Sequence, residues 1–144
     1  MKPIFLFCTL FIAALQASSQ QQAPVKKQKW HWQGDQDTIA GYAQVVKVDN
    51  VLYISGTVST EITPAGISRL YSAIEKSLQQ FGAGFQHVVK ENLYTTDIEE
   101  MKKHNDVRKA FYKDDFPAAT WVQVSRLFMA DAKLEVEVIA HLPK

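Results

Sequence analysis

Cysteine is nearly absent from this sequence, because Cys8 is the only one among 144 residues. It lies within Pro3 to Leu15, a continuous apolar run that follows the basic start Met1-Lys2 and precedes small residues at positions 17–19. This layout is typical of a secretory signal peptide, and the run is too short to span a bilayer comfortably. We therefore expect residues 1–19 to be a signal peptide and the protein to be exported, periplasmic or secreted. An ordinary buried element is the less favoured interpretation.

Removal of that segment would leave a mature chain without a thiol, which excludes disulfides, thiolate catalysis and cysteine-ligated metals. The sequence also has no large excess of either charge, since it contains 16 Lys and Arg residues and 15 Asp and Glu residues. Residues 1–19 contain one lysine and no acid, so the mature chain has 15 of each. A neutral domain does not support nucleic-acid binding. We expect no nucleic-acid partner, and no membrane partner after cleavage.

Motifs for metals, phosphates and serine nucleophiles are missing as well. The four histidines have no ligand-type spacing, so we expect neither a metal site nor a cofactor. There is no Gly-x-Ser-x-Gly sequence and no phosphate-binding glycine loop. Residues 20–29 are largely polar, and residues 20–37 are predicted to form a flexible leader, which leaves residues 38–144 as one domain. Trp30-His31-Trp32 either packs this leader onto the domain, which we favour, or stacks on a ligand.

Hydrophobic periodicity predicts two hairpins and two helices. Runs at 42–48 and 51–56 alternate around Asp49-Asn50, which predicts a tight turn. Runs at 117–126 and 134–140 also alternate, and we expect them to pair as a second hairpin. A third strand is predicted at 86–95. One helix is predicted from its apolar stripe (Ile67, Leu70, Tyr71, Ile74, Leu78 and Phe81) with a stop at Gly82, and a second from Asp97 onward (Met101, His104, Val107, Ala110 and Phe111).

The resulting order, β-β-α-β-α-β-β, predicts an α+β domain. Its helices would cover one face of a mixed sheet. The other face would then need a cover, and a closed oligomer is the obvious candidate.

From about Ile39 to Pro143 the chain resembles the RidA/YjgF family, also called endoribonuclease L-PSP. The matching residues are Gly41-Tyr42-x-Gln44, Leu52-Tyr53-Ile54-Ser55-Gly56, Val88-Val89-Lys90 through Tyr94 and Asp97, Asn105 with Phe111, Pro117-Ala118, and Leu134-Glu135-Val136-Glu137. The resemblance implies a chorismate-mutase-like fold and a homotrimer with ligand clefts between neighbouring subunits. Endoribonuclease action gains no support from a neutral surface.

Family members that hydrolyse enamines and imines use an arginine after the Pro-Ala pair to hold the substrate carboxylate. Here that position is Ala119, and Trp121 stands where a small residue is common. The two share a strand face, which predicts a smaller or more aromatic cleft that no longer selects a small carboxylate. Arg69, Arg108 and Arg126 could substitute, but we expect them at the surface or at strand ends.

The resemblance also implies the remaining cleft residues. Tyr42 would be the aromatic wall, Ser55 and Gly56 would supply hydroxyl and backbone donors, Asn105 an amide, and Glu135 the catalytic carboxylate. Each has a purely structural alternative, such as packing for Tyr42, a turn for Gly56 and a solvated carboxylate for Glu135. Glu135 and Glu137 would share a strand face. Two hypotheses remain: a trimer that binds a small molecule without standard deaminase activity, and an enamine or imine hydrolase that uses Glu135 and bound water.

Overall fold

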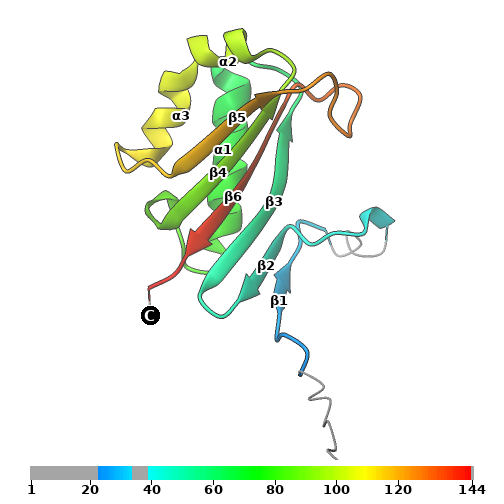
Figure 1. Ribbon diagram of the computed structural model, residues 1–144, viewed down its shortest axis with the longest axis vertical. Coiled ribbons are helices and arrows are strands. Elements are labelled where there is room, and N and C mark those ends of the chain that lie inside the picture. The colour runs from blue at the N-terminus through cyan, green and yellow to red at the C-terminus, as the bar shows by residue number, and fades with distance from the viewer. Residues whose placement is uncertain (1–22, 34–38, 144) are drawn as a thin grey trace, which may run out of the picture.

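The computed structural model describes residues 23–33 and 39–143, so the predicted signal peptide lies outside the described residues. Six strands form one sheet in the order β1-β2-β3-β6-β4-β5 (Figure 1). The strands are β1 (Gln28–Trp30), β2 (Val45–Val48), β3 (Val51–Ser59), β4 (Val88–Thr95), β5 (Ala118–Gln123) and β6 (Leu134–His141). The helices are α1 (Pro64–Gln79), α2 (Ile98–Lys103) and α3 (Asn105–Tyr112), with a 3₁₀ turn η2 (Phe85–His87).

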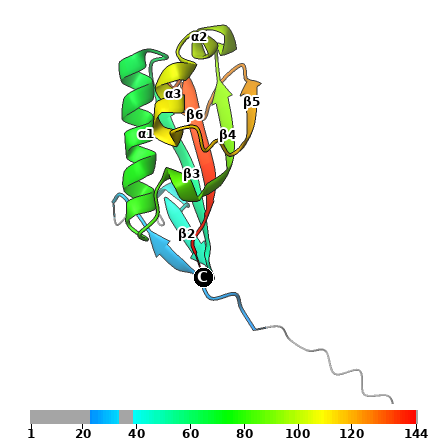
Figure 2. The same ribbon diagram turned by 90° about the vertical axis from the view of Figure 1, so that its left-hand side faces the viewer.

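Helices α1 and α3 lie against one face of the sheet (Figure 2), which confirms the predicted α+β layering. Five members of the predicted stripe of α1 are buried in the core, namely Ile67, Leu70, Tyr71, Ile74 and Leu78. The sixth, Phe81, lies beyond the helix end at Gln79 and is half-buried. The Thr63 hydroxyl caps this helix by accepting from the backbone N–H of Gly66. The stop at Gly82 is also confirmed, because its φ of 70° lies in the left-handed region that favours glycine.

The first predicted hairpin is confirmed, and the second is wrong. Strands β2 and β3 pair antiparallel around a turn in which Asp49 has a φ of 52°. Strand β5, however, pairs in parallel with β4, whereas β6 lies between β3 and β4 and is antiparallel to both. Parallel strands need a long crossover, and α2 with α3 provides one between β4 and β5. Alternation correctly located both strands but carries no information about which neighbour each one chooses.

The second predicted helix is divided in two. It begins as expected, with Asp97 capping the N–H of Glu100, but it breaks at His104 (φ −109°, ψ 20°), where α2 gives way to α3. The break changes which side of α3 faces the sheet. As a result Arg108 and Tyr112 are buried, while Ala110, expected on the apolar face, is exposed.

The leader is more structured than predicted. Residues Gln28–Trp30 form β1, which pairs antiparallel with β2, and Trp30 packs against the core with its ring 4.8 Å from that of Trp32. Trp30 therefore packs the leader onto the domain, as favoured for the aromatic triplet, and residues Gln28–Trp30 form a strand instead of flexible chain. Within residues 23–33 and 39–143, no helix is long and apolar enough to cross a membrane.

Candidate functional site

A cavity of about 470 Å³ opens beside the middle of β3 and the start of β6. It brings together four of the predicted cleft residues, namely Tyr42, Ser55, Gly56 and Glu135. The Ser55 hydroxyl donates to the carbonyl of Ala43 (2.8 Å), and the Ser55 N–H donates to the carbonyl of Gln44 (2.9 Å). These bonds hold the segment that carries Tyr42 against β3. The predicted hydroxyl donor therefore serves to position the aromatic wall.

Position 56 requires glycine because the Glu135 side chain lies against its backbone, and not because the chain turns there. The pairing of β3 with β6 shifts register between Ile54 and Thr57, which leaves Ser55 and Gly56 at an irregularity. A Cβ at position 56 would overlap the carboxylate of Glu135. The glycine thus makes the space in which that carboxylate lies, and the turn interpretation for Gly56 is wrong.

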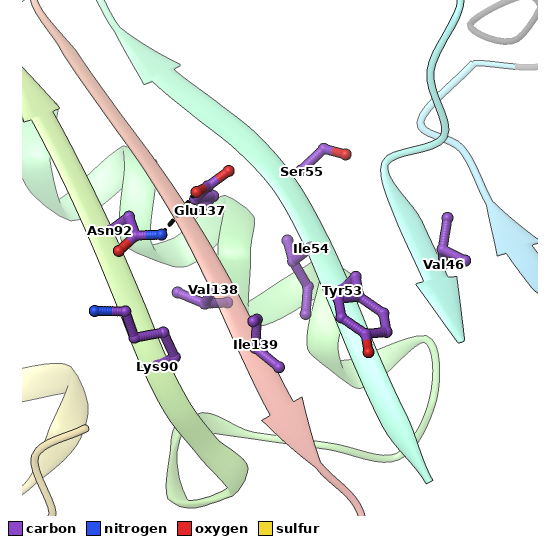
Figure 3. A pocket seen from close by; sticks show the side chains of 9 residues that line it. All are labelled: Val46, Tyr53, Ile54, Ser55, Lys90, Asn92, Glu137, Val138 and Ile139. Atoms are coloured by element: carbon purple, nitrogen blue, oxygen red, sulfur yellow. Dashed lines mark hydrogen bonds between the residues drawn. The ribbon is translucent and has the colours of Figure 1, made fainter. Parts of the chain in front are cut away.

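Glu135 and Glu137 share the face of β6 opposite the helices, as predicted, since the intervening Val136 is buried. Glu137 accepts hydrogen bonds from the Asn92 amide (2.8 Å) and the Tyr94 hydroxyl (3.2 Å). It lines a second hollow of about 280 Å³ on the open sheet face, where its bond to Asn92 is visible (Figure 3). Burial, followed by the charge of Glu137, raises the pKa of Glu135.

No donor among the described residues bonds the Glu135 carboxylate, in contrast to Glu137. A carboxylate that is partly buried and unpartnered can accept a hydrogen bond or a proton from a bound molecule or water. This property agrees with the role that the resemblance implied for Glu135.

The other predicted residues, Asn105, Ala119 and Trp121, lie outside this cavity in the single chain. Ala119 is opposite Glu91 in the β4–β5 register, and Trp121 is opposite Leu93, so both lie on the helix-covered side of the sheet. Asn105 begins α3, and its Oδ1 atom is buried without a hydrogen-bond partner among the described residues. The predicted site is therefore divided between two regions of one protomer.

The region around Ala119 contains a buried ion pair that sequence reasoning missed. Glu91 is fully buried and accepts from Arg108 Nε (2.8 Å), the Tyr71 hydroxyl (3.0 Å), the Tyr112 hydroxyl (2.7 Å) and, more weakly, Trp121 Nε1 (3.4 Å). Burial, and then the charge of Glu91, raise the pKa of both tyrosines, so their hydroxyls stay protonated and donate. The expectation that Arg108 lies at the surface is wrong.

Arg108 remains charged in this setting. Burial acts to lower the pKa of its guanidinium, but the charge of Glu91 and their hydrogen bond contribute to a pKa above the ordinary arginine value. The guanidinium carbon lies 4.9 Å from the ring centre of Tyr112 and 5.4 Å from that of Trp121. Trp121 therefore contributes to the environment of an ion pair instead of only filling space. Arg69, in contrast, forms an exposed pair with Glu61.

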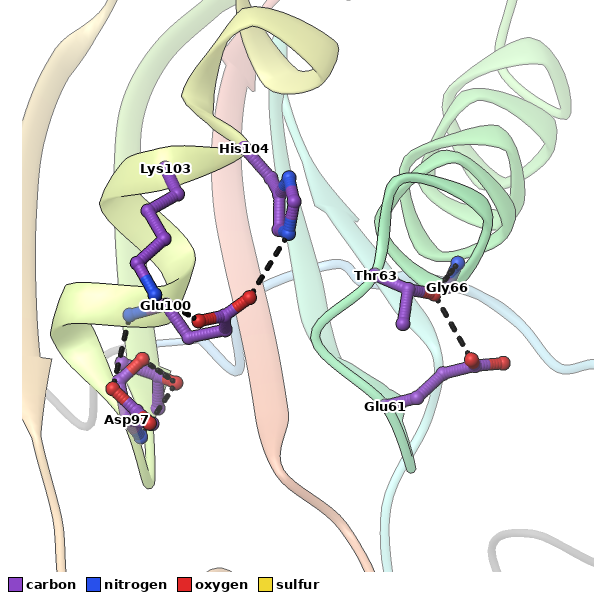
Figure 4. Close-up of polar contacts among 8 residues, drawn as sticks. Glu61, Thr63, Gly66, Asp97, Glu100, Lys103 and His104 are labelled. Atoms are coloured by element: carbon purple, nitrogen blue, oxygen red, sulfur yellow. Dashed lines mark hydrogen bonds and ion pairs between the residues drawn. The ribbon is translucent and has the colours of Figure 1, made fainter.

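Polar contacts near the helix starts are structural (Figure 4). Glu100 accepts from Lys103 Nζ (2.7 Å) and contacts His104 Nε2 (3.1 Å), while Asp97 caps α2. The hydrogen bond from Lys103 lowers the pKa of Glu100 against the opposing effect of burial, and the charge of Lys103 adds to the lowering. These charges satisfy one another at the surface, so we assign them to helix stability.

Comparison with known proteins places the chain in a family. Residues 34–142 match the family model described as Endoribonuclease L-PSP. The chain belongs to the RidA/YjgF family. A RutC family protein of Pyrococcus abyssi is 31% identical, with 72% of this chain and 87% of the relative covered. The 2-iminobutanoate/2-iminopropanoate deaminase of Bos taurus is 32% identical, with 71% and 80% covered.

Solved structures of the family share the fold. A YjgF/YER057c/UK114 family member from Mycobacterium tuberculosis has a TM-score of 0.73 at 22% identity, with 81% of this chain and 100% of that chain covered. A protein of the conserved Rid family from Yersinia pestis has a TM-score of 0.71 at 26% identity, with the same shares covered. These matches confirm the predicted family and fold class.

Proposed function

We propose that this protein is an exported homotrimer that binds a small molecule in a cleft between subunits and lacks standard 2-imino acid deaminase activity. The observation that carries the proposal is the chemistry around Ala119: that strand position has no cationic side chain, and the nearby Arg108 is already paired with Glu91. A small carboxylate substrate would then have no guanidinium dedicated to it.

Two features support assembly of a trimer. The candidate residues occur in two separate regions of one protomer, and apposition of neighbouring copies would join them into one cleft. The open sheet face also carries exposed apolar side chains, including Tyr53 (47% exposed) and Val89 (45% exposed). Light scattering coupled to gel filtration should give three times the monomer mass. A monomeric mass would contradict the proposal.

Deaminase activity is tested by generating 2-aminoacrylate in a coupled assay and measuring release of the 2-oxo acid and ammonia. We expect no turnover above background. As a gain-of-function test, Ala119→Arg combined with Trp121→Cys should introduce measurable activity, whereas Trp121→Cys alone should not. Failure of the double variant to gain activity would show that the lost arginine does not account for the difference from the bovine relative.

A second candidate function is hydrolysis of an enamine or imine with Glu135 and bound water. The specific observation in its favour is that Glu135 has no donor among the described residues and a raised pKa, as a proton-accepting group needs. Water would add to the imine carbon, and ammonia would leave to give the oxo compound. Turnover that is abolished by Glu135→Gln would establish this function in place of binding alone.

Export rests on residues 1–19, which have the composition of a signal peptide. Cell fractionation followed by mass spectrometry of the mature N-terminus tests it. We expect the protein outside the cytoplasm, beginning at Gln20 or Ser18. A full-length chain retained in the cytoplasm would contradict export.

A further inference from the structure

Exposed apolar side chains gather around the cavity that contains Glu135. Of the eleven large hydrophobic residues that are exposed in the described part of the chain, five line this one cavity. Such clustering is characteristic of a binding surface, whereas isolated exposed apolar residues need no explanation. The five are Ile39 (80% exposed), Tyr42 (43%), Val58 (37%), Phe128 (95%) and Met129 (46%).

The formal charge of the cavity lining is negative only. Among the described residues that line it, Glu135 is the only one with a formal charge, and no lysine or arginine is present. A carboxylate ligand would lose its hydration here and meet like charge, whereas a protonated nitrogen would meet an opposite charge.

The Glu135 carboxylate lines the cavity and accepts no hydrogen bond from the described residues, so it is available to a ligand. Glu91 has four donors and Glu137 has two, but none of the described residues donates to Glu135. Gly56 makes room for the carboxylate at the cavity wall, since any larger residue there would collide with it. A charge-assisted hydrogen bond to a nitrogen donor would satisfy it.

We propose that this cavity binds a compound whose amine nitrogen donates to Glu135 and whose apolar body lies against Phe128, Met129 and Tyr42, and that it disfavours the same body bearing a carboxylate. The proposal rests on the proposed function, in that it takes the cavity to be a ligand site, and it specifies the ligand class. A volume of about 470 Å³ suits a ligand of roughly one aromatic ring with a short chain.

Isothermal titration of the full-length protein tests the charge preference with two probes of matched body, 2-phenylethylamine and 3-phenylpropanoate. We expect the amine to bind at least about tenfold more tightly than the carboxylate. Glu135→Gln should weaken amine binding by about tenfold, the effect of one charge-assisted hydrogen bond. Glu137→Gln is the matched control, since that carboxylate is bonded by Asn92 and Tyr94, and it should change affinity much less.

Phe128→Ala tests the apolar wall without disturbing the core, because this side chain is 95% exposed. It should weaken amine binding several-fold and leave the oligomeric mass unchanged. If it instead dissociates the oligomer and leaves amine affinity unchanged, Phe128 belongs to the subunit interface and not to the ligand site, and the proposal is overturned. Equal or tighter binding of the carboxylate, or no binding of either probe at millimolar concentration, also overturns it. These results are separable from the proposed function, which fails on 2-aminoacrylate turnover or a monomeric mass.

Discussion

The buried pair of Glu91 and Arg108 offers the sharpest test of the fold. Replacement of Arg108 by Met keeps an unbranched chain close to the aliphatic part of arginine but removes the guanidinium and its positive charge. Glu91 would keep the donors from Tyr71, Tyr112 and Trp121, yet it would be a fully buried carboxylate without a countercharge. Loss of one partner of a buried ion pair costs about 3–5 kcal/mol. We expect the variant to lose that much of its free energy of unfolding.

Arg69→Met is the matched control, because Arg69 forms an exposed pair with Glu61 and its side chain is 65% exposed. Exposed pairs contribute about 0–1 kcal/mol, so this control should lie near the parent protein. Urea unfolding followed by tryptophan fluorescence, at one fixed protein concentration, measures the difference. With a urea dependence of about 2 kcal/mol per molar, Arg108→Met should lower the midpoint by about 2 M.

A double variant, Glu91→Leu with Arg108→Met, separates the charge from the packing. Because it removes both charges, it should be less destabilised than the sum of the two single variants, with a coupling of about 2 kcal/mol or more. If Arg108→Met matches Arg69→Met within about 1 kcal/mol, the charge on Glu91 does not require Arg108, and the reasoning is refuted.

Four further predictions concern Gly56, Asp97 and Glu135. Gly56→Ala should displace the Glu135 carboxylate, cost about 1–3 kcal/mol in urea unfolding and erase the preference for amine over carboxylate; retention of that preference would contradict the close approach. Asp97→Ala should remove the cap of α2 and cost about 1 kcal/mol by the same measurement, whereas exposed Asp115→Ala should not. Because the pKa of Glu135 is raised, amine affinity should be complete above that pKa and fall as pH drops through it, and titrations of Glu135→Gln should lack this dependence. The same shift favours the protonated folded state, so Glu135 should lower stability as pH rises from 4.5 through its folded pKa.

The features of the fold that could be predicted from the sequence are those set by residues close together in the chain. The stripe of α1, its stop at Gly82 and the Asp49 turn depend on neighbouring residues alone, and all three are present. Strand partners could not be derived in this way. The alternation of β5 and β6 is the same whether they pair with each other or, as found, separately with β4. The choice depends on the crossover through α2 and α3, which is a property of the whole chain.

The candidate site was likewise predicted only in part from the sequence. Tyr42, Ser55, Gly56 and Glu135 were predicted, and the structure brings them to one cavity. The partners of Glu91 were missed, although a signal existed. Glu91 has the same parity as Leu93 and Thr95, which places a carboxylate on the core face of β4. A carboxylate there requires a buried donor or cation. Arg108 could be recognised as that cation only once the break at His104 had set the orientation of α3.

The residues around Ala119 form one connected set of contacts. Ala119 lies opposite Glu91 in the sheet, Trp121 donates to Glu91, and the Trp121 ring lies beside the Arg108 guanidinium. A guanidinium introduced at position 119 would enter a face that already holds one cation paired with one buried carboxylate. The ability of an arginine at position 119 to bind a substrate carboxylate would then depend on whether it also pairs with Glu91, which already pairs with Arg108. Ala119 therefore borders one connected cluster of Glu91, Arg108 and Trp121, and a charge introduced at position 119 would act on the whole cluster.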